Sequence, residues 1–249
     1  MGKPVGRPYT SFCKDSTIGS RKNSLQRGTC LNWETEKHNS ARCAVRTEFL
    51  VQSGQAHKFE ALCSEIRGIL ATAPGFHDAV LLNSLGYPGK YVAIAQWEDR
   101  EAFAAFYRSP ALRETARSGD AVFRINRPEE AYAVVLTVGQ PPAAPGGWRQ
   151  LVEWDIKPGL AAAFETSRKT LFELRQRHGG ILVSQLFRFL GNSSRYLVMQ
   201  AYVSRDAETV GRTVPQIQEF FAAHPATEYV SHAPVGEYYT AVQVTQPAT

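Results

Sequence analysis

At 249 residues, the chain is long enough for two domains of ordinary size, and its 43% hydrophobic and 20% charged residues are typical of a soluble globular protein. No apolar run approaches the roughly 18 residues of a membrane-spanning helix, and the N-terminus lacks the apolar segment of a secretory signal. The sequence therefore predicts a cytoplasmic protein without membrane contact. The net charge of +5 falls within residues 1–44, and the rest of the chain is neutral, which argues against a dedicated nucleic-acid binder.

Residues 1–44 contain Gly, Ser, Lys, Arg and Asn without apolar periodicity, which predicts a disordered basic N-terminal extension. A transit peptide, a polyanion-binding arm and an extension without function all remain open for it. Three of the four cysteines lie in this extension, and no C-x-x-C spacing occurs. The sequence therefore predicts neither a disulfide framework nor a metal site.

The rest of the chain contains an internal repeat. Residues 45–103 align with residues 150–208 at a constant offset of 105 without a gap. The identities include Gly54/Gly159, Phe59/Phe164, Gly75/Gly180, Gly86/Gly191 and Tyr91/Tyr196. Glycines at turns are what two copies of one fold would retain, because few residues replace glycine at positive φ.

Each copy has the order strand, helix, strand, strand, helix, strand. In the first copy we predict strands at 45–52, 76–85, 91–98 and 131–138, and helices at 55–73 and 100–118, the second one broken near Pro110. In the second copy we predict strands at 149–156, 181–190, 194–203 and 237–244, and helices at 160–178 and 206–223, the latter interrupted by Pro215. Residues 139–148 are rich in Pro and Gly, which predicts a linker.

This βαββαβ order is typical of an α+β, ferredoxin-like domain with both helices on one face of an antiparallel sheet. The strands are apolar on both faces, so the helix-free face of each sheet needs a cover, and the other copy can supply it. We therefore expect two tandem ferredoxin-like repeats, 45–138 and 149–249, that form an intramolecular pseudo-dimeric α+β barrel. Whether two chains also associate as a homodimer stays open.

Charged residues recur on the first strand of each copy. Glu48 and Glu153 lie on the face opposite Phe49 and Trp154, so both carboxylates are predicted to point into the barrel. They could serve as acid/base groups with raised pKa values. The favoured alternative is an ion pair with Arg46 or another residue across the two copies.

The third strand of the first copy carries a candidate ligand site. Alternation places Tyr91, Ala93, Ala95 and Trp97 on one face, where two aromatic residues flank two small ones. A flat ligand could lie between them, or a side chain from a facing helix could fill the gap. In the second copy Gln200 and Tyr202 replace Ala95 and Trp97, which predicts a narrower gap and a mainly structural role. The two corresponding faces are Tyr91, Ala93, Ala95 and Trp97, and Tyr196, Val198, Gln200 and Tyr202.

The segment Ala95-Gln96-Trp97-Glu98 follows Pro74-Gly75-Phe76 and precedes a helix with Phe103 and a break at Ser109-Pro110. In this pattern the first copy resembles the antibiotic biosynthesis monooxygenase family. The family includes cofactor-free oxygenases that convert anthrone-type polyketides to quinones, and heme-degrading enzymes. The heme-binding Asn, Trp and His of the latter would fall on Thr47, Phe106 and Ala116, so heme is not expected.

For the quinone-forming branch, the resemblance implies a cofactor-independent monooxygenase whose partners are a small aromatic substrate and O₂. Trp97 matches the family Trp, and Arg113 or Arg117 matches its helix Arg, which implies catalytic roles for these three. The family Asn and Tyr are replaced by Ala93 and Phe103. The implied substrate-binding residues are Tyr91, Ala93, Ala95, Phe103, Phe49 and Thr47. A polyketide cyclase on the same barrel and a non-catalytic binding barrel are the alternatives.

Overall fold

The computed structural model describes residues 42–117, 119, 122–140, 147–178 and 180–242. They belong to the second of the two units into which the chain divides, residues 36–249. The predicted N-terminal extension lies outside the described residues up to position 41, and the predicted linker lies outside them from 141 to 146. Cys43 and Ala44 are buried in the first strand, so this strand begins two residues before the predicted 45–52.

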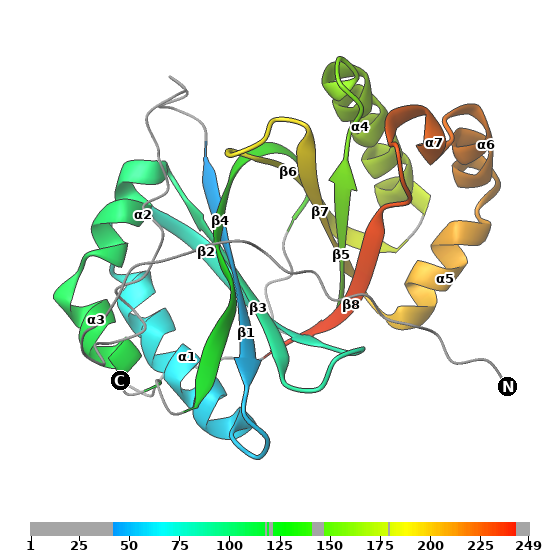
Figure 1. Ribbon diagram of the computed structural model, residues 1–249. Coiled ribbons are helices and arrows are strands. Elements are labelled where there is room, and N and C mark those ends of the chain that lie inside the picture. The colour runs from blue at the N-terminus through cyan, green and yellow to red at the C-terminus, as the bar shows by residue number, and fades with distance from the viewer. Residues whose placement is uncertain (1–41, 118, 120–121, 141–146, 179, 243–249) are drawn as a thin grey trace, which may run out of the picture. The chain divides into compact units, whose positions relative to one another are not determined.

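Eight strands in the described part of the chain form a closed antiparallel barrel (Figure 1). Their order around the barrel is β1-β3-β2-β8-β5-β7-β6-β4. The strands are β1 (Cys43–Val51), β2 (Phe76–Ser84), β3 (Lys90–Trp97), β4 (Phe123–Gly139), β5 (Trp148–Asp155), β6 (Ile181–Phe189), β7 (Arg195–Tyr202) and β8 (Val235–Ala241). The predicted α+β, ferredoxin-like fold is confirmed.

Helices cover the outside of the barrel on two opposite sides (Figure 1). On one side lie α1 (Ala56–Ala71), α2 (Arg100–Tyr107) and α3 (Pro110–Arg117); on the other lie α4 (Ala161–His178), α5 (Arg205–Thr213), α6 (Pro215–Ala223) and α7 (Ala226–Tyr229). The helix breaks fall at Pro110 and Pro215 as predicted, because proline lacks the N–H that would continue a helix. The short helix α7 was not predicted.

The strands before and after the linker region occupy two contiguous parts of the barrel, β4-β1-β3-β2 and β8-β5-β7-β6. Their pairing registers correspond: Cys43 pairs with Trp97, and Trp148 pairs with Tyr202, each 105 positions further along. The register shift near the start of β2 recurs at the start of β6. Two seams join the parts, seven residue pairs between β4 and β6 and three between β2 and β8.

One glycine pair shows why the repeat retains certain positions. Gly75 and Gly180 have φ values of +74° and +63°, which residues other than glycine rarely adopt. A Cβ atom at Gly75 would lie 2.6 Å from Cβ of Ala102, and one at Gly180 would lie 2.9 Å from Cβ of Ala207. Each glycine therefore lets the turn before the second strand pack against the following helix.

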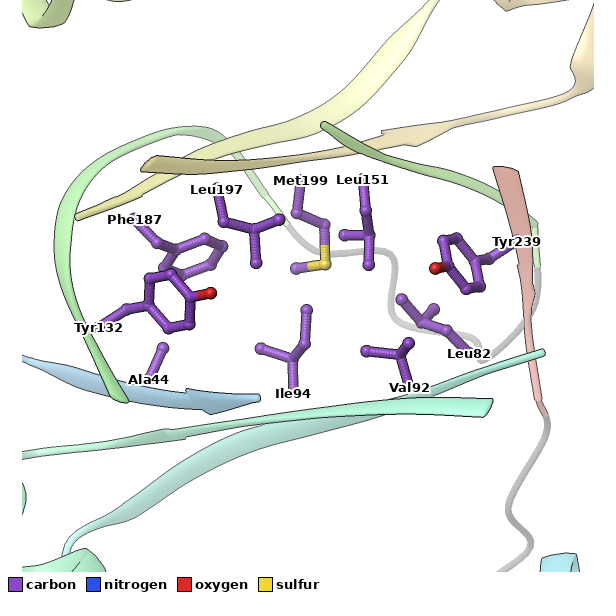
Figure 2. Packing of buried hydrophobic residues seen from close by; sticks show 10 residues of the cluster. All are labelled: Ala44, Leu82, Val92, Ile94, Tyr132, Leu151, Phe187, Leu197, Met199 and Tyr239. Atoms are coloured by element: carbon purple, nitrogen blue, oxygen red, sulfur yellow. The ribbon is translucent and has the colours of Figure 1, made fainter. Parts of the chain in front are cut away.

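The barrel interior has an apolar centre made by both sheets (Figure 2). In Figure 2, Val92 and Ile94 of one sheet point toward Leu151, Leu197 and Met199 of the other. All five are at most 5% exposed. Burial of such side chains stabilises a fold by roughly 1.5–3 kcal/mol each, so this centre holds the two sheets together.

A layer of charged side chains lies beside this apolar centre. Because strand residues alternate, side chains two positions from the central residues also point inward. We call this layer the lumen ion-pair network, and it consists of Arg46, Glu48, Lys90, Glu130, Glu153, Arg195 and Glu237.

Three contacts of the lumen ion-pair network join the two parts of the barrel. Arg46 lies 2.5 Å from Glu153, Lys90 lies 2.8 Å from Glu237, and Arg195 lies 2.8 Å from Glu130. The ion pair expected for Arg46 with a carboxylate of the other copy is therefore confirmed. Glu48 and Glu153 both have charged partners within the network, as the favoured alternative predicted.

The lumen ion-pair network makes the free energy of unfolding depend on pH. Burial alone would raise the pKa of Glu153, but Arg46, with Arg127 and Arg195, lowers it from 4.5 to about 2. A carboxylate whose pKa is lowered on folding stabilises the protein above its unfolded pKa. We therefore expect the free energy of unfolding to fall as pH decreases from about 4.5 to about 2, measured by urea unfolding. Glu153→Gln should flatten this dependence; an unchanged slope in that variant would contradict the assignment.

Candidate functional site

A cavity of about 510 Å³ lies on the outer face of the sheet that follows the linker region. Its walls come from β5, β7 and β8 and from helices α4, α5 and α6. We call it the second-half cavity. The apolar lining consists of Val152, Trp154, Leu171, Phe172, Val198, Phe221, Pro234 and Gly236, and the polar lining of Gln150, Arg168, Arg175, Gln200 and Arg212. Its volume lies in the range of small-molecule sites, about 300–1,000 Å³.

Two simple periodicities place the lining residues. Along β5, Leu151 and Glu153 point into the barrel, so Gln150, Val152 and Trp154 point outward to the helices. On α4, positions 168, 171, 172 and 175 share one face, because a helix repeats every 3.6 residues. That face carries an arginine at each end and apolar side chains between them.

Arg168 lies deep in the second-half cavity. It is 3% exposed, and its guanidinium packs 4.9 Å from the Trp154 ring and 5.1 Å from the Phe164 ring. Its Nη2 donates to Ser167 Oγ at 3.3 Å, while its Nε has no hydrogen-bond partner among the described residues. Burial, with the charge of Arg175, lowers the pKa of Arg168 to about 10, so the group stays positive at neutral pH.

Arg175 lies seven residues, or about two helical turns, further along α4 than Arg168. Its Nη1 donates to Gln200 Oε1 and, at 3.5 Å, to the Tyr202 hydroxyl, and its guanidinium lies 5.6 Å from the Phe221 ring. These oxygen partners are neutral. Burial lowers the pKa of the Arg175 guanidinium, as expected for a cation without a close anion.

Two polar residues connect Arg175 to the sheet. The Tyr202 hydroxyl lies 3.1 Å from Gln200 Oε1 and 3.3 Å from Gln150 Oε1, and Gln200 Nε2 donates to Ser184 Oγ at 3.0 Å. Burial raises the pKa of Tyr202 to about 12, although the charge of Arg175 opposes the shift. Tyr202 is therefore a neutral hydrogen-bond donor at physiological pH.

Arg212 differs from the two arginines of α4. Its side chain is 56% exposed and forms an ion pair with Glu208, and its Nη2 donates to the Tyr238 hydroxyl at 2.9 Å. Arg212 and the partly exposed Phe221 thus mark the solvent side of the second-half cavity. Among the described residues, no carboxylate lies within 4.0 Å of Arg168 or Arg175.

The lining defines what chemistry the second-half cavity can support. Of the described residues that line it, none is a carboxylate, histidine, cysteine or lysine. It therefore offers positive charge, hydrogen-bond donors and aromatic surface, but no ordinary general base. In the described part of the chain, no group of three or more His, Cys, Asp or Glu side chains could hold a metal ion. Likewise, none of the described helices has the length and apolar character to cross a bilayer.

The predicted site residues of the first half lie on the corresponding outer face, against α1 and α2. Trp97 has no exposed surface, and its ring centroid lies 5.4 Å from Phe76, 6.0 Å from Phe103 and 5.1 Å from Phe106. Its Nε1 has no hydrogen-bond partner among the described residues. Trp97 is thus the centre of an aromatic cluster, and its catalytic role stays a prediction.

The structure does not bring the two predicted catalytic arginines to Trp97. Arg113 and Arg117 lie at exposed positions of α3, and Arg113 Nη2 donates to the backbone oxygen of Arg108. None of the contacts that the structure gives for these described arginines is to Trp97. Solvent screens the electrostatic interactions of exposed cations, so Arg113 and Arg117 are poorly placed to stabilise an anion beside Trp97.

The other predicted residues form walls of the same region. Tyr91 is 2% exposed, lies 4.9 Å from the Phe59 ring and donates to Glu60 Oε1 at 2.8 Å. The partly buried residues are Thr47, Phe49, Ala93, Ala95 and Phe103. Phe49 and Ala93 pack with Tyr91 and Phe59, whereas Ala95 and Phe103 pack with Trp97.

Sequence reasoning missed Arg168 and Arg175. Their equivalents in the first repeat, 105 positions earlier, are Cys63 and Leu70. A signal was available, since two arginines seven residues apart interrupt the apolar face of the helix predicted at 160–178. The expectation that the second copy is mainly structural stays a prediction; Gln200, one of the residues on which it rested, accepts a hydrogen bond from Arg175.

Comparison with models of known families gives a match in the first half of the chain. Residues 43–118 match the model of the family Antibiotic biosynthesis monooxygenase, the family that the resemblance predicted. No curated protein matched the sequence.

Solved structures share the fold over most of the chain. A candidate monooxygenase from Fusobacterium nucleatum subsp. nucleatum has a TM-score of 0.67 at 11% identity, covering 81% of this chain and 93% of its own. One from Lactobacillus acidophilus has a TM-score of 0.61 at 10% identity, covering 82% and 95%. An anthrone oxidase-like protein has a TM-score of 0.55 at 11% identity, covering 82% and 92%. At these identities the likeness shows the fold.

Proposed function

We propose that the protein is a cofactor-independent monooxygenase that oxidises an electron-rich polycyclic aromatic of the anthrone type to a quinone. The main support for this proposal is the second-half cavity, where Arg168 and Arg175 have no carboxylate partner within 4.0 Å in the described chain. The family of residues 43–118 and the fold shared with an anthrone oxidase-like protein support the proposal. The site proposed here is the second-half cavity.

The reaction asks little of the protein beyond holding and stabilising an anion. A hydroxyanthrone loses a proton to solvent, and the carbanion or phenolate transfers an electron to O₂. The substrate radical and superoxide combine into a peroxide anion on the ring carbon, and a proton from solvent converts it to the hydroperoxide. Loss of water then converts the former CH₂ group to a carbonyl, so one oxygen atom enters the quinone and the other leaves as water.

The arginines can promote this reaction by lowering the energy of the anion. A cation in a site of low dielectric constant stabilises negative charge more strongly than in water, and it needs no rearrangement when the charge develops. Arg175 is held by Gln200 and Tyr202, so its position is fixed before the substrate binds. Aromatic walls such as Trp154 and Phe172 favour a flat substrate.

Non-catalytic binding of a small anion is the second candidate function. The lack of a general base among the described lining residues favours it. The same observation weighs against a cyclase, because ring closure of a polyketide needs proton transfers by positioned acid and base groups. Anaerobic and aerobic incubation followed by mass spectrometry separates the candidates: oxygen-dependent product, oxygen-independent product, or no product.

We also propose that the two halves are tandem ferredoxin-like repeats, 45–138 and 149–249, joined by the linker 139–148 as an intramolecular pseudo-dimer. Equal pairing registers at an offset of 105 positions support this origin. So do matching contacts of the tyrosines: Tyr91 donates to Glu60 at 2.8 Å, and Tyr196 donates to Glu165 at 2.7 Å.

The proposed oxygenase activity is tested by O₂ uptake with a panel of hydroxyanthrones, using protein freed of metals and flavin. The unmodified protein is expected to consume one O₂ per quinone formed. Arg175→Met should lower kcat/KM by roughly 100-fold, the usual effect of removing one group that stabilises an oxyanion.

Arg177→Met provides the matched control, since Arg177 is an exposed arginine near the end of the same helix. Its activity should stay near that of the unmodified protein. Absence of O₂ uptake across the whole panel would refute the oxygenase proposal.

A further inference from the structure

The deep end of the second-half cavity holds a positive charge with very little hydrogen bonding. A guanidinium carries five N–H donors, yet Arg168 makes one hydrogen bond among the described residues, from Nη2 to Ser167 Oγ at 3.3 Å. Arg168 is 3% exposed, so bulk water gives its donors little compensation. Burying a charge without hydrogen-bond acceptors costs folding free energy, so Arg168 would gain from an acceptor in the cavity.

A second donor in the same place lacks a partner. Trp154 is 9% exposed, its indole Nε1 has no hydrogen-bond acceptor in the described chain, and its ring lies 4.9 Å from the Arg168 guanidinium. Both residues line the second-half cavity. Arg168 and Trp154 thus each have a buried donor without a partner in the described chain, and both side chains line the same cavity.

The chemistry of the donors selects the acceptor. The planar fork of a guanidinium matches the two oxygens of a carboxylate, and such charge-assisted bonds are about twice as strong as neutral ones. No protein carboxylate fills this role within 4.0 Å of Arg168 in the described part of the chain. A ligand carboxylate would both neutralise Arg168 and occupy its donors.

The remaining walls define the rest of the ligand. Leu171 and Phe172 lie between the two arginines on α4, and Val152 and Val198 face them from the sheet. Seven residues along a helix rise by about 10 Å, which is the scale of a skeleton of two or three fused rings. An acid of this size could place its carboxylate at Arg168 and a ring oxygen near Arg175.

We infer that the second-half cavity binds an aromatic carboxylate of two or three fused rings, with the carboxylate on Arg168. This inference rests on the proposed function, because it names the substrate class of the same site. Arg168 is a binding residue in this assignment, whereas Arg175 lies nearer the oxygen that becomes negative during the reaction.

The test measures dissociation constants by anaerobic isothermal titration calorimetry on the full chain. The ligands are 2-naphthoate and anthracene-2-carboxylate, each compared with its neutral carboxamide. Each carboxylate is expected to bind at least 10-fold more tightly than its carboxamide. Arg168→Met should weaken carboxylate binding by about 10- to 100-fold, as expected for the loss of charge-assisted hydrogen bonds. It should leave carboxamide binding within about twofold. Arg177→Met is the control, with carboxylate affinity unchanged.

A stability measurement separates lost binding from lost folding. Arg168→Met removes an unpaired buried charge and keeps an apolar side chain, so the Tm without ligand should not fall. The rise in Tm on adding 2-naphthoate should disappear in this variant. Equal binding of acid and carboxamide, or undiminished binding to Arg168→Met, would overturn the inference.

The inference and the oxygenase proposal can fail independently. Tight binding that depends on Arg168, together with no O₂ uptake by any hydroxyanthrone, would support the carboxylate site and refute the oxygenase. Oxidation of hydroxyanthrones, together with binding of 2-naphthoate that Arg168→Met leaves unchanged, would support the oxygenase and refute the carboxylate site.

Discussion

Arg46→Ala is expected to lower the free energy of unfolding by about 3–5 kcal/mol, because removing one partner of a buried ion pair leaves the other charges uncompensated. Arg46 is 4% exposed and contacts Glu153 at 2.5 Å and Glu48 and Glu130 at 3.4 Å. The variant would leave these carboxylates short of positive charge inside the barrel. Urea unfolding at pH 7 measures the loss.

Arg127→Ala is the matched control for this effect. Arg127 contacts the same Glu153 at 3.0 Å, but its side chain is 44% exposed. An exposed ion pair contributes about 1 kcal/mol or less, so this variant should stay close to the unmodified protein. If Arg46→Ala also lost less than about 1 kcal/mol, the lumen ion-pair network would not hold the sheets together.

Trp97→Ala is expected to cost about 3–5 kcal/mol of unfolding free energy, because it empties a fully buried aromatic site. Phe76, Phe103 and Phe106 surround the ring and would border the resulting void. Any loss of O₂ uptake in this variant would therefore report unfolding as well as catalysis. Thermal and urea unfolding measure the stability term.

Trp97→Phe separates packing from chemistry. It keeps an aromatic ring within the cluster and should cost less stability than Trp97→Ala. With the site in the second-half cavity, kcat/KM should remain within about threefold of the unmodified protein, under 1 kcal/mol of transition-state stabilisation. A variant that stays folded but loses roughly 100-fold would instead place the reaction at the first-half site that the family resemblance implied.

Most of the fold could be read from the sequence, because alternation, helical periodicity and turn glycines act locally. Besides the short helix α7, the main difference is β4, expected at 131–138 but found at 123–139. Its first part contains Pro128 and several charges, which resemble a loop. In the structure a register shift lies between the pairs of Arg127 and Glu130 with β1, and both charged residues have partners around the lumen. Proline fits a strand at such an irregularity.

The site could be predicted less well, because it depends on contacts between distant segments. The sequence pattern drew attention to Trp97, whose three ring contacts come from β2 and α2. It could not show that Arg113 and Arg117 are exposed, nor that Arg168 packs over Trp154 without a carboxylate beside it. Burial and charge pairing decide such roles, and neither follows from spacing alone.

Closure of the barrel within one chain changes how the protein responds to dilution and to mutation. Two separate subunits dissociate at low concentration, whereas here both seams, β2 with β8 and β4 with β6, join parts of the same polypeptide. A substitution in a symmetric two-chain barrel would also appear twice. In this chain one half keeps Ala95 while the other has Gln200, and one has Leu70 where the other has Arg175. The two outer faces are therefore free to diverge, one toward dense aromatic packing and the other toward a charged cavity.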